Sequence, residues 1–537
     1  MADEPVDVLV IGSGAAGAAV SKRLTDLGAK VMCLEQGGWV KPTDYPSTRP
    51  NWEIQLKRGP FNFSPNVRKR WEDYPVVETG PNPPDILMFN AVGGSTHHWT
   101  GHFPRFHPSD FRVKSLDGVA VDWPISYREL EPYYDMNDRE MGVAGITGDP
   151  ANPPRSKRPT APLPLGTLGE TIGRGFDKLG WYWWVSDNAI ISQNYQGRPA
   201  CELHGKCMFG CPIGAKASTD VTYWRKAIRK GAVVKPWSRV REITVGKNGL
   251  ARGAVYYDRQ GNLHEQLAKI VVLCANGVGT PRLLLNSKSK LFRDGLANSS
   301  GLVGANFMLH PFRFLEGVFE APMDGHIGPF GIPAFSQQFY ETDLNRGFIR
   351  GYSFLLERSF GPLHHAWGGF VQKPVPWGRT HHQIMRQRFP HIIRVTVMGE
   401  DLPDAKNRVE LDPEKKDSSG IPAPRVVYAY SENSLKMLDH GYRMGKQALE
   451  AAGAVEILDS GIIQPAFHLL GTARMGDDPK TSVVNKWHQS HDVKNLFIID
   501  GSSFATSAAV NPTSTIGALA LRAADGIWAQ RQSFDFA

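Results

Sequence analysis

The most constraining feature of this sequence is a glycine-rich motif that joins an apolar segment to a helical one near the start of the chain. Residues 8–11 are β-formers and lead directly into Gly12-x-Gly14-x-x-Gly17, after which a helical pattern begins. Gly12 permits a tight turn out of the strand, Gly14 lets the backbone approach a pyrophosphate, and Gly17 lets the helix pack closely on the sheet. The N-terminus of such a helix faces the phosphates of a dinucleotide.

An acidic residue follows the glycine motif at the distance that is typical of dinucleotide sites. A second apolar run ends at Glu35, twenty-three residues after Gly12, where an acidic side chain can accept a hydrogen bond from a ribose hydroxyl. Glycine motifs also mark ordinary turns, but the order strand, turn, helix, strand and acid predicts a dinucleotide site in an α/β fold. The motif by itself does not distinguish FAD from NAD.

The chain is long enough for more than one domain. With 537 residues it is expected to contain about two. Apolar runs at 269–273 and 496–500 predict further strands of the nucleotide-binding sheet, whereas aromatic strands at 312–319 and 392–398 predict a largely antiparallel second domain. We therefore predict a nucleotide-binding domain with covering loops and a cysteine-bearing insertion at about 195–215, a substrate-binding domain, and a return to the first domain, over residues 1–311, 312–460 and 461–537.

Composition excludes several classes of protein. No stretch of eighteen apolar residues occurs, so no transmembrane helix is expected. The first residues lack the features of an export signal, which predicts a cytoplasmic protein or one exported with a signal-bearing partner. The net charge of +8 predicts a basic solvated surface or docking to an acidic protein or membrane face. Nucleic acid is not an expected partner, because no recognition motif accompanies the charge.

Three of the five cysteines lie close together in the sequence. The odd number argues against a disulfide framework. Cys201, Cys207 and Cys211 lie in a Gly/Pro-rich loop, and thiolates at this spacing can hold an iron–sulfur cluster. Zinc is a weaker alternative, because its sites usually contain CxxC pairs and a fourth ligand, for which His204 is the candidate. The third alternative is that these are simply buried thiols.

Six segments in a fixed order point to a family. They are the glycine motif, Val92-Gly-Gly-Ser-Thr-His-His-Trp99, Cys274-Ala-Asn-Gly277, Asn306-Phe-Met-Leu-His-Pro311, His468-Leu-Leu-Gly-Thr-Ala-Arg-Met-Gly476, and Asp500-Gly through Asn511-Pro-Thr. This order resembles the glucose–methanol–choline oxidoreductase family over essentially the whole chain. The resemblance implies FAD rather than NAD. It also implies a Rossmann-like FAD-binding domain and a mixed α+β substrate domain built on an antiparallel sheet.

The resemblance assigns roles to particular residues. His468 is the expected base, which takes the proton of a hydroxyl group while the hydride of its carbon moves to the flavin; an imidazole titrates in a suitable range. Asn511 is expected to orient the substrate oxygen, although it also has the residue type of a helix N-cap, with Pro512 as the first helical residue. The residues expected to bind the cofactor are Gly12, Gly14, Gly17, Glu35, Gly93, Gly94, His98, Asn276, Asp500 and Gly501.

Two further resemblances refine the cofactor prediction. His98-Trp99-Thr100 and Asn511-Pro-Thr are similar to pyranose 2-oxidase, which implies a covalent bond between His98 and FAD; otherwise His98 is a loop residue near the flavin ring. The cysteine pattern resembles the large catalytic subunits of bacterial FAD and iron–sulfur sugar dehydrogenases for glucose, glucosides, fructose and gluconate. This implies a [3Fe–4S] cluster on Cys201, Cys207 and Cys211. It also implies a small subunit with an export signal, a cytochrome c-type acceptor, a periplasmic location and membrane association through these partners only.

The predicted activity is therefore a FAD-dependent dehydrogenase that oxidises a hydroxyl of a sugar or glycoside and passes electrons to an external acceptor. An oxygen-using pyranose or glycoside oxidase is the nearest alternative, and a flavin lyase without redox chemistry is a remote one. Aromatic residues can stack on sugars and histidines can bind hydroxyls, so one loop is a candidate wall of the substrate chamber. Its residues, which could instead form an exposed loop or a core, are His364, His365, Trp367, Phe370 and Trp377.

Overall fold

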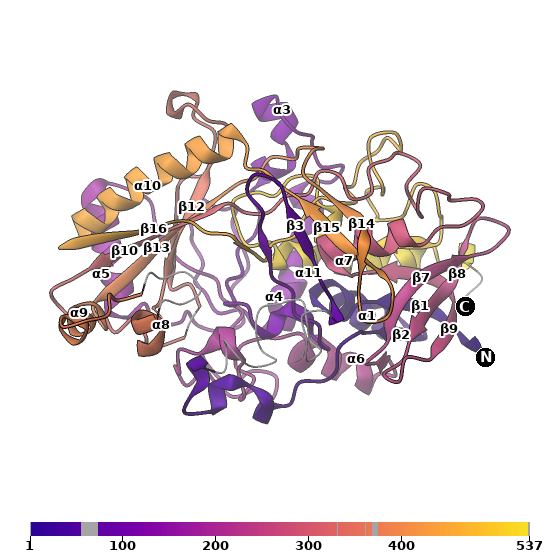
Figure 1. Ribbon diagram of the computed structural model, residues 1–537, viewed down its shortest axis with the longest axis horizontal. Helices are drawn as coiled ribbons and strands as arrows, with labels where there is room; N and C mark the ends of the chain where they lie inside the picture. The colour runs from indigo at the N-terminus through magenta and orange to yellow at the C-terminus, as the bar shows by residue number, and fades with distance from the viewer. Residues whose placement is uncertain (1, 55–72, 330, 360, 368–373, 535–537) are drawn as a thin grey trace.

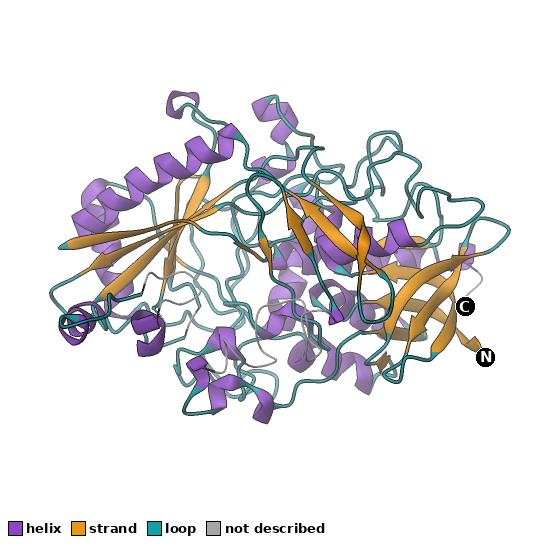
Figure 2. Ribbon diagram, viewed as in Figure 1, coloured by secondary structure: helices purple, strands orange, loops and turns teal. Residues whose placement is uncertain are grey.

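The computed structural model describes residues 2–54, 73–329, 331–359, 361–367 and 374–534. Two large sheets lie at opposite ends of the molecule, and a small sheet and several helices lie between them (Figure 1). Long loops connect these elements, especially between the two large sheets (Figure 2). Both ends of the described chain lie beside the first large sheet (Figure 1).

The first sheet contains the glycine motif. Its strand order is β6-β2-β1-β9-β8-β7, with β18 beside β9. The pairs β1–β2, β1–β9, β2–β6 and β9–β18 are parallel, whereas β7 and β8 extend the sheet as an antiparallel edge. The strands are β1 (Ala2–Ile11), β2 (Val31–Leu34), β6 (Val233–Lys235), β7 (Arg239–Val245), β8 (Ala251–Tyr257), β9 (Leu263–Leu273) and β18 (Leu496–Ile498).

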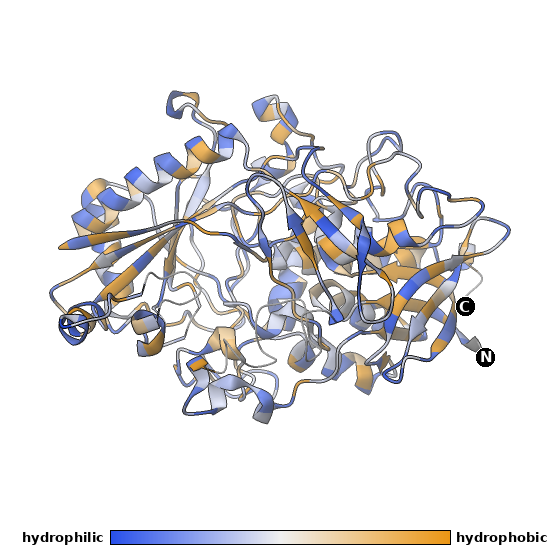
Figure 3. Cartoon of the chain, in the orientation of Figure 1, coloured by the Kyte–Doolittle hydropathy of each residue, from blue (hydrophilic) through white to orange (hydrophobic). Residues whose placement is uncertain are grey.

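Helices cover the first sheet and bury its apolar strands. Helix α1 follows the glycine motif, and α11 packs against both α1 and α4. The ends of β1 and β9, residues 8–11 and 270–273, are apolar and buried where they pair with each other (Figure 3), as expected for parallel strands covered by helices. The helices of this region are α1 (Ala15–Leu27), α4 (Tyr127–Met141), α6 (Arg225–Arg229), α7 (Asn276–Asn286) and α11 (Thr513–Ala529), whereas the short α3 (Val113–Asp117) lies apart from the sheet (Figure 1).

The second sheet is antiparallel and has the order β16-β10-β13-β12-β11-β5. All residues of β13 are buried, and α10 packs on the sheet with α5 beside it. The strands are β5 (Trp184–Val185), β10 (Phe312–Val318), β11 (Ala334–Phe339), β12 (Tyr352–Glu357), β13 (Ile392–Gly399) and β16 (Glu456–Ile462). The helices are α5 (Gly166–Leu179), α8 (Pro362–Trp367), α9 (His381–Arg388) and α10 (Glu432–Ala452).

Two small sheets complete the fold. The order β14-β15-β3 forms a sheet next to α7, and β17 pairs with β4. Their strands are β3 (Val77–Thr79), β4 (Asp85–Ile86), β14 (Arg408–Lys416), β15 (Pro422–Val427) and β17 (Pro465–Ala466). Among the described helices, none combines the length and the apolar character needed to cross a bilayer.

The predicted strands are confirmed, and one helix start is wrong. The runs at 269–273 and 496–500 lie side by side in the first sheet, and those at 312–319 and 392–398 pair antiparallel in the second. Helix α11 begins at Thr513 with Pro512 as its N-cap residue, so Asn511 does not cap it. Strand β5 and helix α5 belong with the second sheet although they precede residue 312, and the three predicted segments stay a prediction.

Candidate active site

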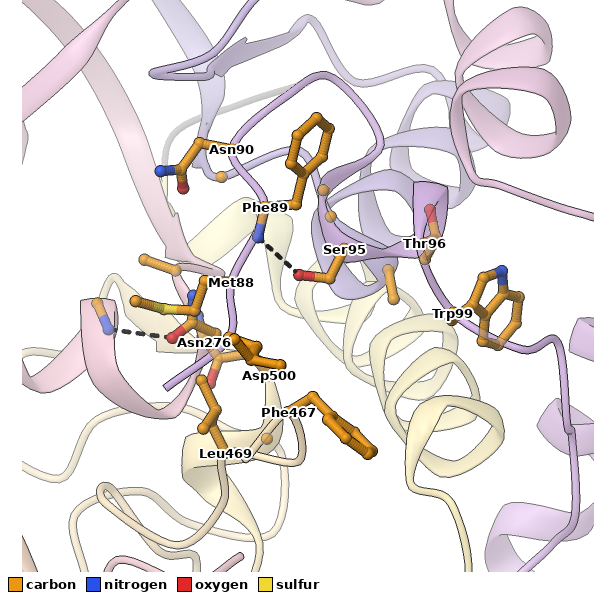
Figure 4. Close-up of a pocket in the computed structure, with 18 of the residues that line it drawn as sticks. Met88, Phe89, Asn90, Ser95, Thr96, Trp99, Asn276, Phe467, Leu469 and Asp500 are labelled. Carbon is orange, nitrogen blue, oxygen red and sulfur yellow. Dashed lines mark hydrogen bonds between the residues drawn. The ribbon is translucent and has the colours of Figure 1, made fainter. Parts of the chain in front are cut away.

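One cavity of about 330 Å³ lies where the first sheet, the second sheet and the loops between them meet. Residues distant in sequence share its wall, and Figure 4 shows Met88, Phe467 and Leu469 near Asn276 and Asp500. Gly17 and Gly93 are not on this wall. The residues predicted from sequence that do line it are Gly12, Gly14, Glu35, Gly94, His98, Asn276, His468, Asp500, Gly501 and Asn511.

The glycine motif forms one end of the cavity. Gly12 has a φ of +99°, and a Cβ there would lie 2.4 Å from the carbonyl oxygen of Cys274. A Cβ on Gly17 would lie 1.9 Å from the carbonyl oxygen of Gly12, so the helix can approach the turn only without a side chain. Gly14 faces open space and is followed on the cavity wall by the first residues of α1. This arrangement fits a diphosphate held by the N-terminus of a helix.

Two buried carboxylates border the same end. Glu35 accepts hydrogen bonds from the backbone N–H of Ser13 at 3.0 Å, from its hydroxyl at 2.7 Å and from the N–H of Gly37 at 2.8 Å. Asp500 accepts bonds from the N–H of Asn276 at 3.0 Å and from Thr280. Burial raises the pKa of both carboxyl groups. Because acidic acceptors and a glycine turn line one continuous cavity, the wall fits FAD.

A chain of histidines and one amide forms the other end. His310 Nε2 lies 2.9 Å from the carbonyl oxygen of Ala508, and His310 Nδ1 lies 2.9 Å from His468 Nδ1. His468 Nε2 lies 3.3 Å from Asn511 Nδ2, and Asn511 Oδ1 lies 2.8 Å from His102 Nδ1. The side-chain amide that was expected to cap a helix is therefore bonded to two histidines instead.

The carbonyl of Ala508 fixes where each proton lies in this chain, which we call the histidine ladder (His310, His468, Asn511 and His102). A carbonyl only accepts, so His310 carries its proton on Nε2 and presents a lone pair on Nδ1. His468 must then donate from Nδ1, which leaves the lone pair on Nε2, where the amide N–H of Asn511 points. The Asn511 oxygen in turn accepts from His102 Nδ1.

The histidines of the ladder are neutral at ordinary pH. Burial lowers the pKa of His468 well below its usual value, and His310 and His102 lower it further. Burial also lowers the pKa of His310 and that of His102 to about 4. The sequence analysis took the ordinary range of an imidazole for this base, whereas burial holds the pKa of His468 below that range. The lower pKa keeps the lone pair of His468 available over a wide pH range.

His98 also lies on the cavity wall. Its Nδ1 donates to the carbonyl oxygen of Met208 at 2.8 Å, so the neutral ring has its lone pair on Nε2. Burial lowers the pKa of His98 to about 3, which keeps the ring neutral. Its ring packs edge-on to Phe89, whose N–H donates to the Ser95 hydroxyl at 3.1 Å (Figure 4). The ring thus has a fixed orientation beside the cofactor end of the cavity.

The cysteine loop does not form a metal site in the described part of the chain. No group of three or more His, Cys, Asp or Glu side chains there could hold a metal ion. The sulfur of Cys201 accepts a bond from the N–H of Leu203, and that of Cys211 from the N–H of Lys216, each at 3.4 Å. Cys207 is buried in the core. The predicted cluster is therefore not supported by the described residues.

The substrate side of the cavity differs from the prediction. His364 and His365 are buried in α8, whereas Trp367 and Trp377 are exposed, and none of the four lines the cavity. Phe370 lies outside the described residues. The wall is formed instead by alternate positions of two strands, Phe312 and Phe314 on β10 and Leu355 and Glu357 on β12. Ile332 and Arg394 complete it. The period-two pattern of these strands was the signal that could have identified them.

Two residues of the ladder were also missed. His310 lies in one of the six segments that define the family resemblance, but no role was assigned to it. His102 follows His98 by four residues and belongs to no predicted set. Neither could be assigned from spacing, because their partners lie 158 and 409 residues away in the chain.

This cavity has the parts of a site that binds FAD and removes a proton from a substrate, and comparisons with known proteins agree. Two family models described as GMC oxidoreductase match residues 165–312 and 403–520. The chain is 48% identical to 2-methyl-1,2-propanediol dehydrogenase from Mycolicibacterium austroafricanum, over 98% of this chain and 95% of that protein. It is 32% identical to the fructose dehydrogenase large subunit of Gluconobacter japonicus, over 97% of each.

The fold is shared with solved structures of low sequence identity. Pyridoxine 4-oxidase from Mesorbium loti superposes with a TM-score of 0.68 at 17% identity, covering 97% of this chain and 99% of that one. The chain belongs to the GMC oxidoreductase family. It is a FAD-dependent oxidoreductase that acts on CH–OH groups, with a Rossmann-like FAD-binding domain and a substrate domain, as the sequence predicted.

Proposed function

We propose that this protein is a FAD-dependent dehydrogenase that oxidises one hydroxyl of a polyhydroxylated substrate, a sugar, glycoside or smaller polyol, to a carbonyl. The observation that carries this proposal is the lone pair on His468 Nε2, whose position is fixed through His310 by the carbonyl of Ala508. Two of the relatives act, by their names, on a diol and on fructose. This range supports a hydroxyl-rich substrate.

The ladder gives each atom of the reacting hydroxyl a partner. Asn511 Nδ2 and His468 Nε2 are 3.3 Å apart, so one hydroxyl group can accept from the amide through its oxygen and donate its proton to the imidazole. Bound FAD supplies the acceptor for the hydride that leaves the carbon. His468 then holds the hydroxyl proton on Nε2, while its Nδ1 proton stays directed at His310. Phe312, Phe314 and Leu355 exclude water from this side of the cavity.

The test of this function is anaerobic reduction of the purified holoenzyme by a panel of sugars, glycosides and small polyols. We expect the flavin absorbance to bleach with at least one of them, and NMR of the product to show a new carbonyl. Turnover should be faster with a dye acceptor than with oxygen. An enzyme that reduces oxygen as readily as the dye would instead favour the oxidase alternative, for which paromamine 6'-oxidase is a relative at 28% identity.

We further propose that His98 is the covalent attachment point of FAD. Its support is the neutral ring with a lone pair on Nε2 on the cavity wall. After acid precipitation, the yellow colour should remain with the wild-type protein and move to the supernatant for His98→Ala. His97 is the matched neighbour, since its ring is bonded to Tyr45 and to the carbonyl of Val92, so His97→Gln should retain the colour. A colourless wild-type pellet would contradict the tether.

Electron delivery to a partner is proposed from the relatives. The name of the fructose dehydrogenase large subunit supports a smaller partner subunit. The proposal that this subunit carries an export signal, that the acceptor is a cytochrome of the c type and that the location is periplasmic rests on the family resemblance of the sequence. A [3Fe–4S] cluster stays outside the proposed reaction, because it rests on the spacing of Cys201, Cys207 and Cys211 and on the family resemblance, and the described residues form no metal site. Metal analysis and EPR test for the cluster. Roughly three iron atoms per chain would support its presence, whereas an active enzyme without iron would exclude it.

A further inference from the structure

His102 has one ring nitrogen that the ladder leaves unused. Its Nδ1 proton is directed at Asn511, so the lone pair lies on Nε2. This nitrogen is buried and has no hydrogen-bond partner among the described residues, and the side chain lines the cavity. His102 is 1% exposed, and its ring packs edge-on to Phe335 at 5.9 Å between centroids. A buried acceptor without a partner is costly, so the content of the cavity is the source of the missing donor.

The amide of Asn511 places this second acceptor beside the first. Its nitrogen is directed at His468 and its oxygen accepts from His102, so the two imidazoles lie on opposite edges of one small group. His468 Nε2, to which the Asn511 amide already donates, takes the hydrogen of the reacting hydroxyl, whereas His102 Nε2 has no donor among the described residues, so the two nitrogens call for two hydroxyl hydrogens. A simple alcohol brings one such hydrogen and satisfies only one of the two nitrogens. A diol brings two.

We propose that His102 Nε2 accepts a hydrogen bond from a second hydroxyl next to the one that is oxidised, and that the site thereby selects 1,2-diols, including those within sugars, over simple alcohols. This inference rests on the proposed function. Anions are disfavoured at the same place, because two lone pairs would face their negative charge. The low pKa of His102 keeps Nε2 unprotonated at neutral pH, which makes the acceptor available to a hydroxyl.

Two substitutions separate the roles of the two ring nitrogens of His102. The amide N–H of His102→Asn can replace the Nδ1 proton that holds Asn511, but this variant offers no acceptor at the position of Nε2. The amide oxygen of His102→Gln can reach the position of Nε2, but the variant loses the donor to Asn511. His102→Asn should therefore lose the preference for diols. His102→Gln should keep this preference, but its rate of flavin reduction should be lower with every substrate.

The experiment compares 1,2-propanediol with 1-propanol and 2-propanol in anaerobic flavin reduction. The wild type should prefer the diol in kcat/KM, and in His102→Asn kcat/KM for the diol should fall about 30-fold more than kcat/KM for the simple alcohols. In His102→Gln the preference should remain while both rates fall. FAD content and the visible spectrum of each variant show whether it is folded.

Binding provides a readout that needs no turnover. Pinacol is a 1,2-diol without an oxidisable carbon, and it should bind the wild type more tightly than tert-butanol but lose this advantage in His102→Asn. Equal losses for diol and simple alcohol in that variant, or no diol preference in the wild type, would overturn the inference alone. If no compound reduced the wild-type flavin, the proposed function itself would fail.

Discussion

Replacement of His468 by alanine is expected to slow flavin reduction by substrate at least ~10³-fold while FAD stays bound. The variant loses the lone pair that accepts the proton of the reacting hydroxyl. His310 cannot replace it, because its lone pair is directed at position 468 and its proton at Ala508, and His102 is bonded to the other side of the Asn511 amide. Stopped-flow absorbance under anaerobic conditions measures the rate, and the visible spectrum measures bound FAD.

Imidazole and pH provide the controls for this variant. Added imidazole should restore part of the rate in His468→Ala, since the deleted ring leaves a space of matching shape. In the wild type, kcat/KM should stay level through pH 6.5 and fall only in more acidic solution, because burial lowers the pKa of His468 and the base must be unprotonated to act. A normal rate in the variant, or a wild-type decline centred near pH 6.5, would remove His468 as the base.

The sheet that carries the cofactor could be predicted because its signals are local. The apolar run at 8–11, the turn at Gly12 and the helix after Gly14 each follow from neighbouring residues, and the structure contains all three. Strand β18 (Leu496–Ile498) is similarly apolar throughout because it is buried beside β9 in the parallel part of the sheet. In such segments the sequence pattern and the final burial have the same cause.

The site could be predicted only in part, because its bonds join distant segments. Asn511 has the residue type of a helix cap, and its local sequence gave no sign that its amide would bind His102 and His468 instead. The loop with His364 and Trp367 was chosen for its composition, which does not specify which way a side chain faces. The alternation of side chains along a strand shows that Phe312 and Phe314 share one face of the sheet. It identifies them as wall residues only when it is known which face borders the cavity.

The second large effect is expected from His310, which acts on the reaction through His468. In His310→Phe the ring keeps its size but offers no acceptor, so the Nδ1 proton of His468 is left buried without a partner. An unsatisfied donor of this kind costs about 1–3 kcal/mol, which favours the tautomer with its proton on Nε2. That tautomer cannot accept the hydroxyl proton. We therefore expect the rate of flavin reduction to fall about 10- to 100-fold.

A positioning role predicts a particular pattern of change. The rate constant of flavin reduction should fall, whereas the substrate concentration that gives half of the maximal rate should stay the same. The fall should be equal for diols and simple alcohols, which distinguishes His310→Phe from His102→Asn. His440 provides the control, since it is bonded to Tyr352 away from the cavity, and His440→Phe should keep the wild-type rate. Unchanged reduction in His310→Phe would mean that His468 keeps its productive tautomer without the carbonyl of Ala508, and the proton assignment of the whole ladder would then be wrong.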